Sequence, residues 1–514
     1  MTRVLLPVIA ITIFVSFFRL GSVTLFDVDE AVFAEATKEM VQSGDLITPT
    51  YNGENRYDKP ILFYWLMAAS YKVFGINEFA TRFSSALSGF ILCLGLLFFL
   101  RQFTDEKMAL YAVTSLAISI YFFAYSHAAV TDMTLTLFIT LSLFSFYLSL
   151  EKDRRYVYGL YIFSALAFLT KGLIGILFPF GIATIYIVVK DGLKGIRKLF
   201  NLKAFVVFLI IALPWYIVQI LINKDEFIQA FFIKHHFKRY TGVISGHKGP
   251  IFYYIPTLIV GLFPWIAFLP AGIKIVFKKN SELWNHNSKL NLFAFIWFAF
   301  ILIFFSFSTT KLPNYILPAI PAASILIASG ISQRDERWRR YSYGFIAVLS
   351  VLLGIAIIVS RVYLSKMGIH DLDWTILIAV IMLMMTVIAL YAIFIKKIIY
   401  GPISFLMIAF LLVLSIKVLP LASQHLQGTL YKYSLYAKER LQGDERIITY
   451  GMNNPSIVFY SGHRIINVGD REQLSSLKNA GRLIIAKAKD IETLKDLGFN
   501  LIERDKGYAI LERK

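Results

Sequence analysis

The sequence predicts an all-α integral membrane bundle of about 13 transmembrane helices, followed by a small C-terminal α/β domain. Three observations predict this fold. Hydrophobic residues make up 57% of the 514 residues and charged residues only 17%, whereas soluble domains are roughly 45–50% apolar. Apolar runs that can, with their flanks, cross about 30 Å of hydrocarbon recur along the chain. After residue 419 the composition turns to that of a soluble domain.

The membrane domain, residues 1–419, contains about thirteen apolar segments by hydropathy. The first follows a basic Thr2-Arg3 start, and no small-residue cleavage motif follows it. We therefore expect a retained span rather than a signal peptide. The predicted spans are residues 4–20, 80–100, 108–123, 127–149, 156–170, 172–190, 203–222, 251–277, 291–308, 312–331, 342–361, 373–395 and 401–419.

Basic residues gather in alternate loops between the predicted spans. The lysines and arginines of these loops lie within residues 101–107, 152–155, 190–203, 274–289, 334–340 and 396–397. Because cytoplasmic loops carry such an excess, the N-terminus is predicted to be cytoplasmic. Thirteen spans then place the C-terminal domain, residues 420–514, outside the cytoplasm. The net charge of +19 is attributed to this orientation, and in part to anionic membrane lipids, rather than to nucleic acid.

Chemistry is expected in three external loops that are long or rich in polar groups, at residues 21–79, 223–250 and 308–315. In the first loop, apolar residues at helical spacing predict helices that lie at the membrane surface. The C-terminal domain alternates strand-like runs with a helical stretch, at residues 446–450, 482–486, 491–497 and 508–511. The single cysteine, Cys93, lies in an apolar run and excludes an intrachain disulfide.

Acidic residues open the first external loop. Asp27, Asp29 and Glu30 lie within four residues, and Glu35 follows on the next helical turns. Such carboxylates bind a hard divalent cation, or one of them acts as a base beside a substrate hydroxyl. We predict Asp29 as a catalytic residue, and Asp29, Glu30 and Asp132 as ligands of a divalent Mg, Mn or Zn ion. The alternative is helix capping, because Asp29 stands where an N-cap belongs.

Asp132 lies inside the apolar segment 128–138, close to the external end of its predicted span. An ionisable group at such a place is costly, and it indicates a functional site with a partner. We predict that Asp132 is a second catalytic carboxylate and faces the same cavity as Asp29. The alternative is a carboxylate that reaches out to interfacial water.

Cationic side chains recur in the external segments. A fixed cation at the membrane surface lies where the phosphate of a lipid lies. The candidates for contacts to a lipid phosphate or to the sugar are Arg56, Asp58, Lys59, Lys171, Lys311 and Tyr315. The alternative for each charged residue is a surface ion pair of little energetic value.

The second external loop carries the sequence Lys-His-His-Phe-Lys-Arg-Tyr at residues 234–240. His236 and Arg239 are further candidates for phosphate or sugar contact, which we favour over a zinc site of protein histidines. A solvated basic loop is the alternative. No phosphate-cradling glycine loop and no dinucleotide fingerprint occurs, so no nucleotide cofactor is expected.

Taken in order, these residues resemble the motifs of bacterial lipid A aminoarabinose transferases, and more broadly of membrane glycosyltransferases of the protein O-mannosyltransferase superfamily. The resemblance runs through most of the membrane region. The matching positions are Asp29-Glu30 with Phe33-Ala34-Glu35, Asp58-Lys59-Pro60, Gly75 to Arg82, Asp132, Thr170-Lys171-Gly172, Leu213-Pro214-Trp215, His236 with Arg239, Tyr253-Tyr254, and Lys311 to Tyr315. Each motif is short, and together they are highly specific.

The resemblance implies a GT-C fold of interfacial helices on a bundle of about thirteen spans, in the bacterial inner membrane. It also implies an undecaprenyl-phosphate-linked sugar donor, inversion at the anomeric carbon, and lipid A or another envelope glycolipid as acceptor. The sequence departs from the aminoarabinose enzymes at two positions. Asp58 stands where they carry glutamate, and Arg56 where they tend to carry an aromatic residue. These departures leave the donor sugar open.

We therefore predict a membrane glycosyltransferase in which Asp29 acts as general base or orients the acceptor. Lys59 and the other cations would neutralise the departing polyprenyl phosphate. Two rivals remain. A lipid flippase or transporter shares the many spans and the buried charge, although the sequence shows no internal repeat. A protein O-mannosyltransferase shares the chemistry but acts on protein hydroxyls.

Overall fold

A computed structural model describes residues 2–230, 249–277, 286–476 and 481–513 of the chain. The chain divides into two compact units. The first, here called the helical unit, comprises Met1–Phe18, Asp58–Leu62 and Ser85–Lys417. The second, here called the mixed unit, comprises Arg19–Tyr57, Phe63–Ser84 and Val418–Lys514. Helix α4 runs from the mixed unit into the helical unit.

Helices overlap every predicted span. They are α1 (Thr2–Phe17), α4 (Glu78–Leu100), α5 (Glu106–Ala117), α6 (Ile120–Ser126), α7 (Thr131–Glu151), α8 (Val157–Lys171), α9 (Ile174–Asp191), α10 (Leu202–Phe227), α12 (Tyr254–Gly261), α13 (Leu269–Val276), α14 (His286–Ser306), η5 (Pro313–Ala319), α15 (Ile320–Ser332), α16 (Glu336–Lys366), α17 (Asp373–Ile395) and α18 (Tyr400–Val413). Within the described residues, nine helices are long and apolar enough to cross a membrane, and two bent pairs raise the number to eleven.

Two of the predicted spans are broken in the middle. Helices α5 and α6 meet at a bend of 57°, where the Ser119 hydroxyl accepts the Phe122 N–H and so caps the second helix. Helix α12 and the segment Trp265–Val276 meet at a bend of 112°. Pro264 lies in that break, where its missing N–H and fixed ring interrupt a helix. The two bends explain why hydropathy alone shows one span where the structure has two helices.

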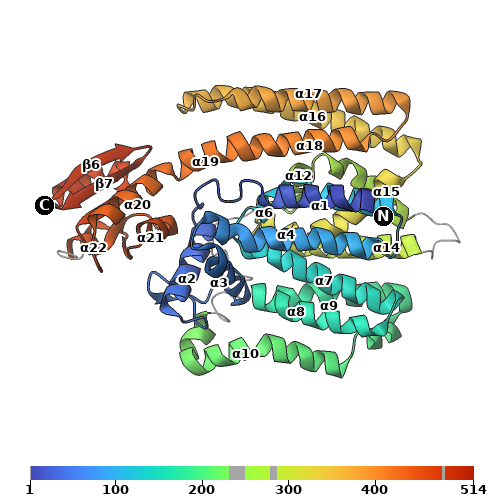
Figure 1. Cartoon of the computed structure of the whole chain (residues 1–514), viewed down its shortest axis with the longest axis horizontal. Helices are drawn as coiled ribbons and strands as arrows, with labels where there is room; N and C mark the ends of the chain where they lie inside the picture. The colour runs from blue at the N-terminus through green and yellow to red at the C-terminus, as the bar shows by residue number, and fades with distance from the viewer. Residues whose placement is uncertain (1, 231–248, 278–285, 477–480, 514) are drawn as a thin grey trace. The chain divides into compact units, whose positions relative to one another are not determined.

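Helix α7 lies in the interior of the helical unit. In its apolar 18-residue stretch 83% is buried, against 17% in the corresponding stretch of α16. Figure 1 shows α7 beside α8, and small hydroxyl side chains join the two helices. The Ser142 hydroxyl donates to the Leu160 carbonyl at 2.8 Å and lies 2.9 Å from the Ser164 hydroxyl. Small polar residues allow close helix approach in membrane proteins. The first turn of α7, which carries Asp132, is therefore set by a tightly packed interior helix.

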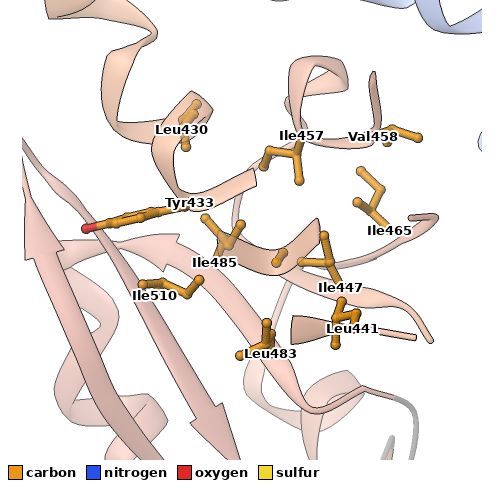
Figure 2. Packing of buried hydrophobic residues seen from close by; sticks show 11 residues of the cluster. Leu430, Tyr433, Leu441, Ile447, Ile457, Val458, Ile465, Leu483, Ile485 and Ile510 are labelled. Atoms are coloured by element: carbon orange, nitrogen blue, oxygen red, sulfur yellow. The ribbon is translucent and has the colours of Figure 1, made fainter. Parts of the chain in front are cut away.

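The C-terminal part of the mixed unit contains a five-stranded sheet of order β4-β3-β5-β7-β6. Strand β3 (Ile447–Tyr450) pairs in parallel with β4 (Ile465–Val468) and with β5 (Leu483–Lys487). Strand β7 (Tyr508–Arg513) pairs antiparallel with β5 and with the edge strand β6 (Phe499–Asp505). Three of these strands and α23 (Ile491–Asp496) coincide with the runs predicted from the sequence. Buried aliphatic residues between the sheet and the helices α20 (Gly428–Arg440) and α21 (Pro455–Ser461) form its core (Figure 2).

The first predicted external loop also forms helices, α2 (Asp29–Ser43) and α3 (Leu62–Phe74), with a two-stranded ribbon of β1 (Thr50–Tyr51) and β2 (Glu54–Asn55) between them. Helix α2 is buried on all sides over its first turns, from Glu30 to Thr37, and ends at Gly44, whose φ of +78° suits the left-handed cap. Leu25, Ala31 and Ala34 pack against Phe459 and Tyr460 of α21. The first loop and the C-terminal part therefore share one hydrophobic contact within the mixed unit.

Candidate active site

The acidic segment 27–30 opens helix α2, and its carboxylates have different surroundings. Glu30 is buried, and its two oxygens accept from Arg82 Nε at 2.7 Å and Nη2 at 2.8 Å. The Phe26 N–H also donates to this carboxylate, at 2.9 Å. The Arg82 guanidinium in turn donates to the carbonyls of Leu20, Val23 and Thr24. Glu30, which the sequence predicted as a metal ligand, is therefore engaged by a buried guanidinium that folds the chain around it.

Asp27 is held by residues of the C-terminal part. Its carboxylate accepts from the Ser456 N–H at 2.9 Å, from the Ser456 hydroxyl at 2.6 Å and from the Asn454 amide at 3.0 Å. The Gln427 amide, in the orientation that satisfies both of its neighbours, donates to the same carboxylate at 3.1 Å. Burial raises the pKa of Asp27, and the hydrogen bonds from Ser456 and Asn454 oppose that rise.

Asp29 is exposed, unlike Glu30 next to it. It is the first residue of α2, and the N-cap position is held by Val28, whose side chain makes no capping bond. Asp29 is therefore not the N-cap of this helix. Toward the described residues the Asp29 carboxylate makes no hydrogen bond or ion pair. An exposed carboxylate at the first turn of a helix is available to a substrate hydroxyl or to a cation.

In the helical unit, Asp132 and Lys171 form a buried ion pair, with 2.6 Å between Asp132 Oδ1 and Lys171 Nζ. Asp132 stands in the first turn of α7, where a negative charge is favourable, and Lys171 stands in the last turn of α8, where a positive charge is favourable. The ammonium lies 5.7 Å from the centre of the Tyr315 ring. The structure thus brings together three predicted site residues from distant parts of the sequence.

Lys311 has a different environment from Lys171. Its ammonium donates to the carbonyls of Phe305, Ser306 and Ser308 at 3.3, 2.7 and 2.7 Å. These carbonyls belong to the last turn of α14 and the residues after it, which need donors because the helix ends there. Burial lowers the pKa of Lys311. An ammonium has three N–H donors, and all three of Lys311 are used, so its geometry is that of a helix cap.

Arg56, Asp58 and Lys59 are half-buried. In the mixed unit, Arg56 Nε donates to the Tyr64 hydroxyl at 3.3 Å, and its guanidinium lies 5.9 Å from the centre of the Phe33 ring. In the helical unit, Lys59 Nζ donates to the carbonyl of Asp58 at 3.2 Å. A bond from a lysine to the preceding carbonyl keeps the ammonium close to the backbone.

The remaining predictions concern the histidine loop and a metal. His236 and Arg239 lie outside the described residues. Among the described residues, no group of three or more His, Cys, Asp or Glu side chains has the arrangement of a metal site. Glu30 is paired with Arg82 and Asp132 with Lys171, and carboxylates paired with buried cations do not fit a cation site.

Sequence reasoning did not assign the residues that hold the acidic segment. Arg82 lies within the Gly75 to Arg82 motif, and an arginine at the start of an apolar helix is a signal that could have indicated its role. Asn454 and Ser456 belong to an Asn-Pro-Ser turn. Such turns precede many helices, so this one gave no sign of a distant aspartate.

Comparison with known proteins gives the family. The model of the family described as dolichyl-phosphate-mannose-protein mannosyltransferase matches residues 58–218. An uncharacterized protein of Aquifex aeolicus is 32% identical over 359 residues, which cover 69% of this chain and 68% of that protein. The undecaprenyl phosphate-alpha-4-amino-4-deoxy-L-arabinose arabinosyl transferase 2 of Pseudomonas fluorescens is 30% identical over 347 residues, which cover 66% of this chain. The match spans 58% of that transferase's length.

A solved structure shows the same fold. The crystal structure of ArnT from Cupriavidus metallidurans bound to undecaprenyl phosphate aligns with a TM-score of 0.83 and 22% identity, over 99% of this chain and 97% of that one. The fold, the relatives and the ordered motifs agree. This chain therefore belongs to the aminoarabinose transferase family of membrane glycosyltransferases, which use polyprenyl-phosphate sugars and have the GT-C fold.

Proposed function

We propose that this glycosyltransferase moves a sugar from undecaprenyl phosphate to lipid A, or to a related envelope glycolipid, at the outer face of the bacterial inner membrane. The observation that carries the proposal is the exposed Asp29 in the family's Asp-Glu motif, beside a Glu30 that Arg82 fixes. The relatives' names and the lipid bound in the similar crystal structure support the donor.

The proposed reaction is one displacement with inversion. An acceptor oxygen forms a bond to the anomeric carbon, while the bond from that carbon to the phosphate oxygen breaks. The electron pair goes to the polyprenyl phosphate. Where the acceptor is a hydroxyl, Asp29 takes its proton. Where the acceptor is a phosphate oxygen, which is already ionised, Asp29 positions it.

Lys171 is the best placed of the predicted cations in the helical unit to meet the developing phosphate charge. Asp132 accepts one of its N–H groups and fixes the ammonium, and no further hydrogen bond to a described residue uses the other two donors. Lys59 shares this role in the proposal. Arg56, Asp58 and Tyr315 contribute to sugar or phosphate contact, as do His236 and Arg239 in the second external loop.

The predicted divalent cation has no ligand set among the described side chains. Incubation with EDTA tests the cation directly. Unchanged turnover after chelation and dialysis would remove it from the mechanism, whereas loss that Mg, Mn or Zn restores would support it.

The proposed orientation has the N-terminus in the cytoplasm and the C-terminal part outside. In this proposal helices α1 and α8, which have 16 and 15 residues, also cross the membrane and complete the thirteen spans. A cysteine placed at Asp444, in an exposed turn, should react with a membrane-impermeant maleimide in spheroplasts. Protection of this position until the membrane is broken would contradict the orientation.

The acceptor is tested with purified protein and labelled donor. Release of undecaprenyl phosphate that requires lipid A supports the proposal, and mass spectrometry of lipid A from cells with and without the gene should show the added sugar. The second candidate acceptor is a protein hydroxyl, which the matching mannosyltransferase model favours. Release that requires a Ser/Thr peptide instead of lipid A would select that candidate.

The role of Asp29 is tested by Asp29→Asn, which keeps the size of the side chain but removes its charge. Loss of a general base costs roughly a hundredfold or more in turnover. Asp132→Asn should fall in the same range if both carboxylates serve one reaction, and the double variant should be little worse than either single one. Near-normal transfer by folded Asp29→Asn protein would defeat this mechanism.

A further inference from the structure

We infer that Asp27 is a positioning residue for Asp29, and that the C-terminal α/β part of the chain serves catalysis by holding Asp27. The inference rests on the proposed role of Asp29. It assigns a task to residues 427–456 that neither the motifs nor the reaction explains.

The anchor at Asp27 is unusually complete for a side chain in a loop. Ser456 contributes both its N–H and its hydroxyl, and Asn454 and Gln427 each contribute an amide donor, at distances of 2.6 to 3.1 Å. Gln427 also accepts the Asp27 N–H at 3.2 Å. Both oxygens of the carboxylate and the adjacent backbone are thus fixed by groups more than 390 positions away in the chain. Bonds to a charged carboxylate are stronger than neutral ones.

The element that provides these donors is part of a packed core. Ile457 and Val458, which follow Ser456 directly, are buried with Leu430 and Ile465 in the hydrophobic cluster of the C-terminal part (Figure 2). Close-packed interiors transmit displacement rather than absorb it. Ser456 is therefore fixed by the sheet and helices behind it, and Asp27 is held at a rigid surface.

The second anchor lies on the other side of Asp29. Glu30 is fixed by Arg82, whose guanidinium also binds the three carbonyls of residues 20, 23 and 24. Asp29 thus lies between two immobilised carboxylates, yet its own carboxylate is exposed. This arrangement restricts the backbone at residue 29 and leaves the side chain available to substrate, as catalytic groups require.

The kinetic test uses Ser456→Ala and Asp27→Asn. Both should lower kcat roughly ten- to a hundredfold with little change in KM for the donor, because a misplaced catalytic group slows the chemical step. The double variant should resemble Asp27→Asn, since the hydroxyl bond that Ser456→Ala removes is one of the bonds to the Asp27 carboxylate that Asp27→Asn already disrupts. Additive losses, or a change confined to KM, would overturn the positioning role.

Asn52 offers a matched control. Its amide makes two hydrogen bonds with the backbone of Ile465, at 2.9 and 2.8 Å, so it also joins the first loop to the C-terminal part, through partners other than those of Asp27. Its φ is +57°, which glycine adopts without strain. Asn52→Gly should therefore leave kcat unchanged. A loss equal to that of Ser456→Ala would show that general docking, rather than the anchor at Asp27, matters.

A second readout is independent of activity. The chain has one cysteine, Cys93, which is buried, so the thiol of an Asp29→Cys variant reports on that position alone. Its maleimide reaction rate should change when Ser456→Ala is added and stay the same when Asn52→Gly is added. Equal rates in all three proteins would overturn the inference. Full activity of Asp29→Asn would instead reject the proposed function, and the labelling result would still stand.

Discussion

Three carboxylates within four residues have three different surroundings. Asp27 accepts hydrogen bonds from the C-terminal part, Glu30 pairs with Arg82, and Asp29 is exposed. Spacing alone assigns a shared task to such a cluster, because oxygen ligands close in sequence are the usual sign of a cation site. Residues distant in the sequence bind Asp27 and Glu30, so these two carboxylates are structural. Only Asp29 remains available for the reaction.

The ion pair of Asp132 and Lys171 gives the first prediction. Asp132→Asn should destabilise the purified protein by about 3–5 kcal/mol, because it leaves a buried ammonium without its counter-charge. Adding Lys171→Met should recover most of that stability, since no buried charge then remains. Turnover should stay low in the double variant. Thermal unfolding in detergent measures the first effect, and recovery of activity along with stability would show that the pair has a structural role only.

Lys171 and Lys311, both in the helical unit, give the second prediction. Lys171→Met should weaken binding of undecaprenyl phosphate by about tenfold or more, as expected for a lost bond to a charged group. Lys311→Met should lower the melting temperature instead, because three carbonyls at the end of α14 lose their donor. Binding of labelled lipid and thermal unfolding separate the two. A Lys311→Met protein with normal stability and weakened lipid binding would return Lys311 to the phosphate site.

At the scale of the element, helices α7, α9 and α14 are joined at one end by Glu151. This buried carboxylate pairs with Lys190 of α9 and lies 3.7 Å from Lys289 Nζ of α14. Glu336 is a natural comparison, because it pairs with Arg340 and Lys396 but is 46% exposed, against 7% for Glu151.

Glu151→Gln should therefore cost about 3 kcal/mol of stability, and Glu336→Gln about 1 kcal/mol or less. Thermal unfolding of the two variants under one set of conditions measures the difference. The donor assay at a temperature where both are folded should give normal turnover. Equal melting temperatures would mean that burial of the Glu151 pairs does not contribute to the packing of these helices.

The contact between α2 and α21 makes the stability of the mixed unit depend on pH. Burial raises the pKa of Asp27 above 3.8 and that of Glu35 above 4.5. The folded chain therefore holds these protons more tightly than the unfolded chain, and stability is lost as the pH rises from 3.8 through the raised value. The stability of wild type relative to Asp27→Asn should decrease across that window. A difference that increases with pH would contradict the sign.

The helices show how far hydropathy reaches as a predictor. Every predicted span contains a helix, because a long apolar run has few other ways to satisfy its backbone in a membrane. The breaks near Ser119 and Pro264 were not predicted, since the mean apolar character continues across them. Strands β4 and β6 were also missed. Both lie at the edges of the sheet, where β4 has an exposed Asn467 and β6 has mostly exposed side chains, so neither carries a strong alternating pattern.

At the scale of the whole molecule, the order of the site motifs in the sequence identified the family. The contacts that these residues make could not be predicted from the sequence. The sequence placed Asp132 and Lys171 as separate candidates, and only the packing of α7 against α8 shows that they form a pair. It likewise gave no role to the residues after 420, because the partner of Ser456 is Asp27, at the other end of the chain. Local patterns report which element forms, and long-range pairs depend on topology.

The mixed unit is built from segments at both ends of the chain. The anchor at Asp27 can therefore form only after the last segment has been synthesised. Its earliest segments, Arg19–Tyr57 and Phe63–Ser84, leave the ribosome long before Val418–Lys514. At about 5–20 residues per second, synthesis of residues 85–417 takes roughly 20–70 s. Throughout that interval Ser456 and Phe459 have not been synthesised. Asp27 therefore lacks its hydrogen bond from Ser456, and Leu25 and Ala34 lack their packing against Phe459. On the inference above, a nascent or prematurely ended chain lacks the anchor that positions Asp29, and we expect it to have the lowered turnover of the Asp27→Asn variant.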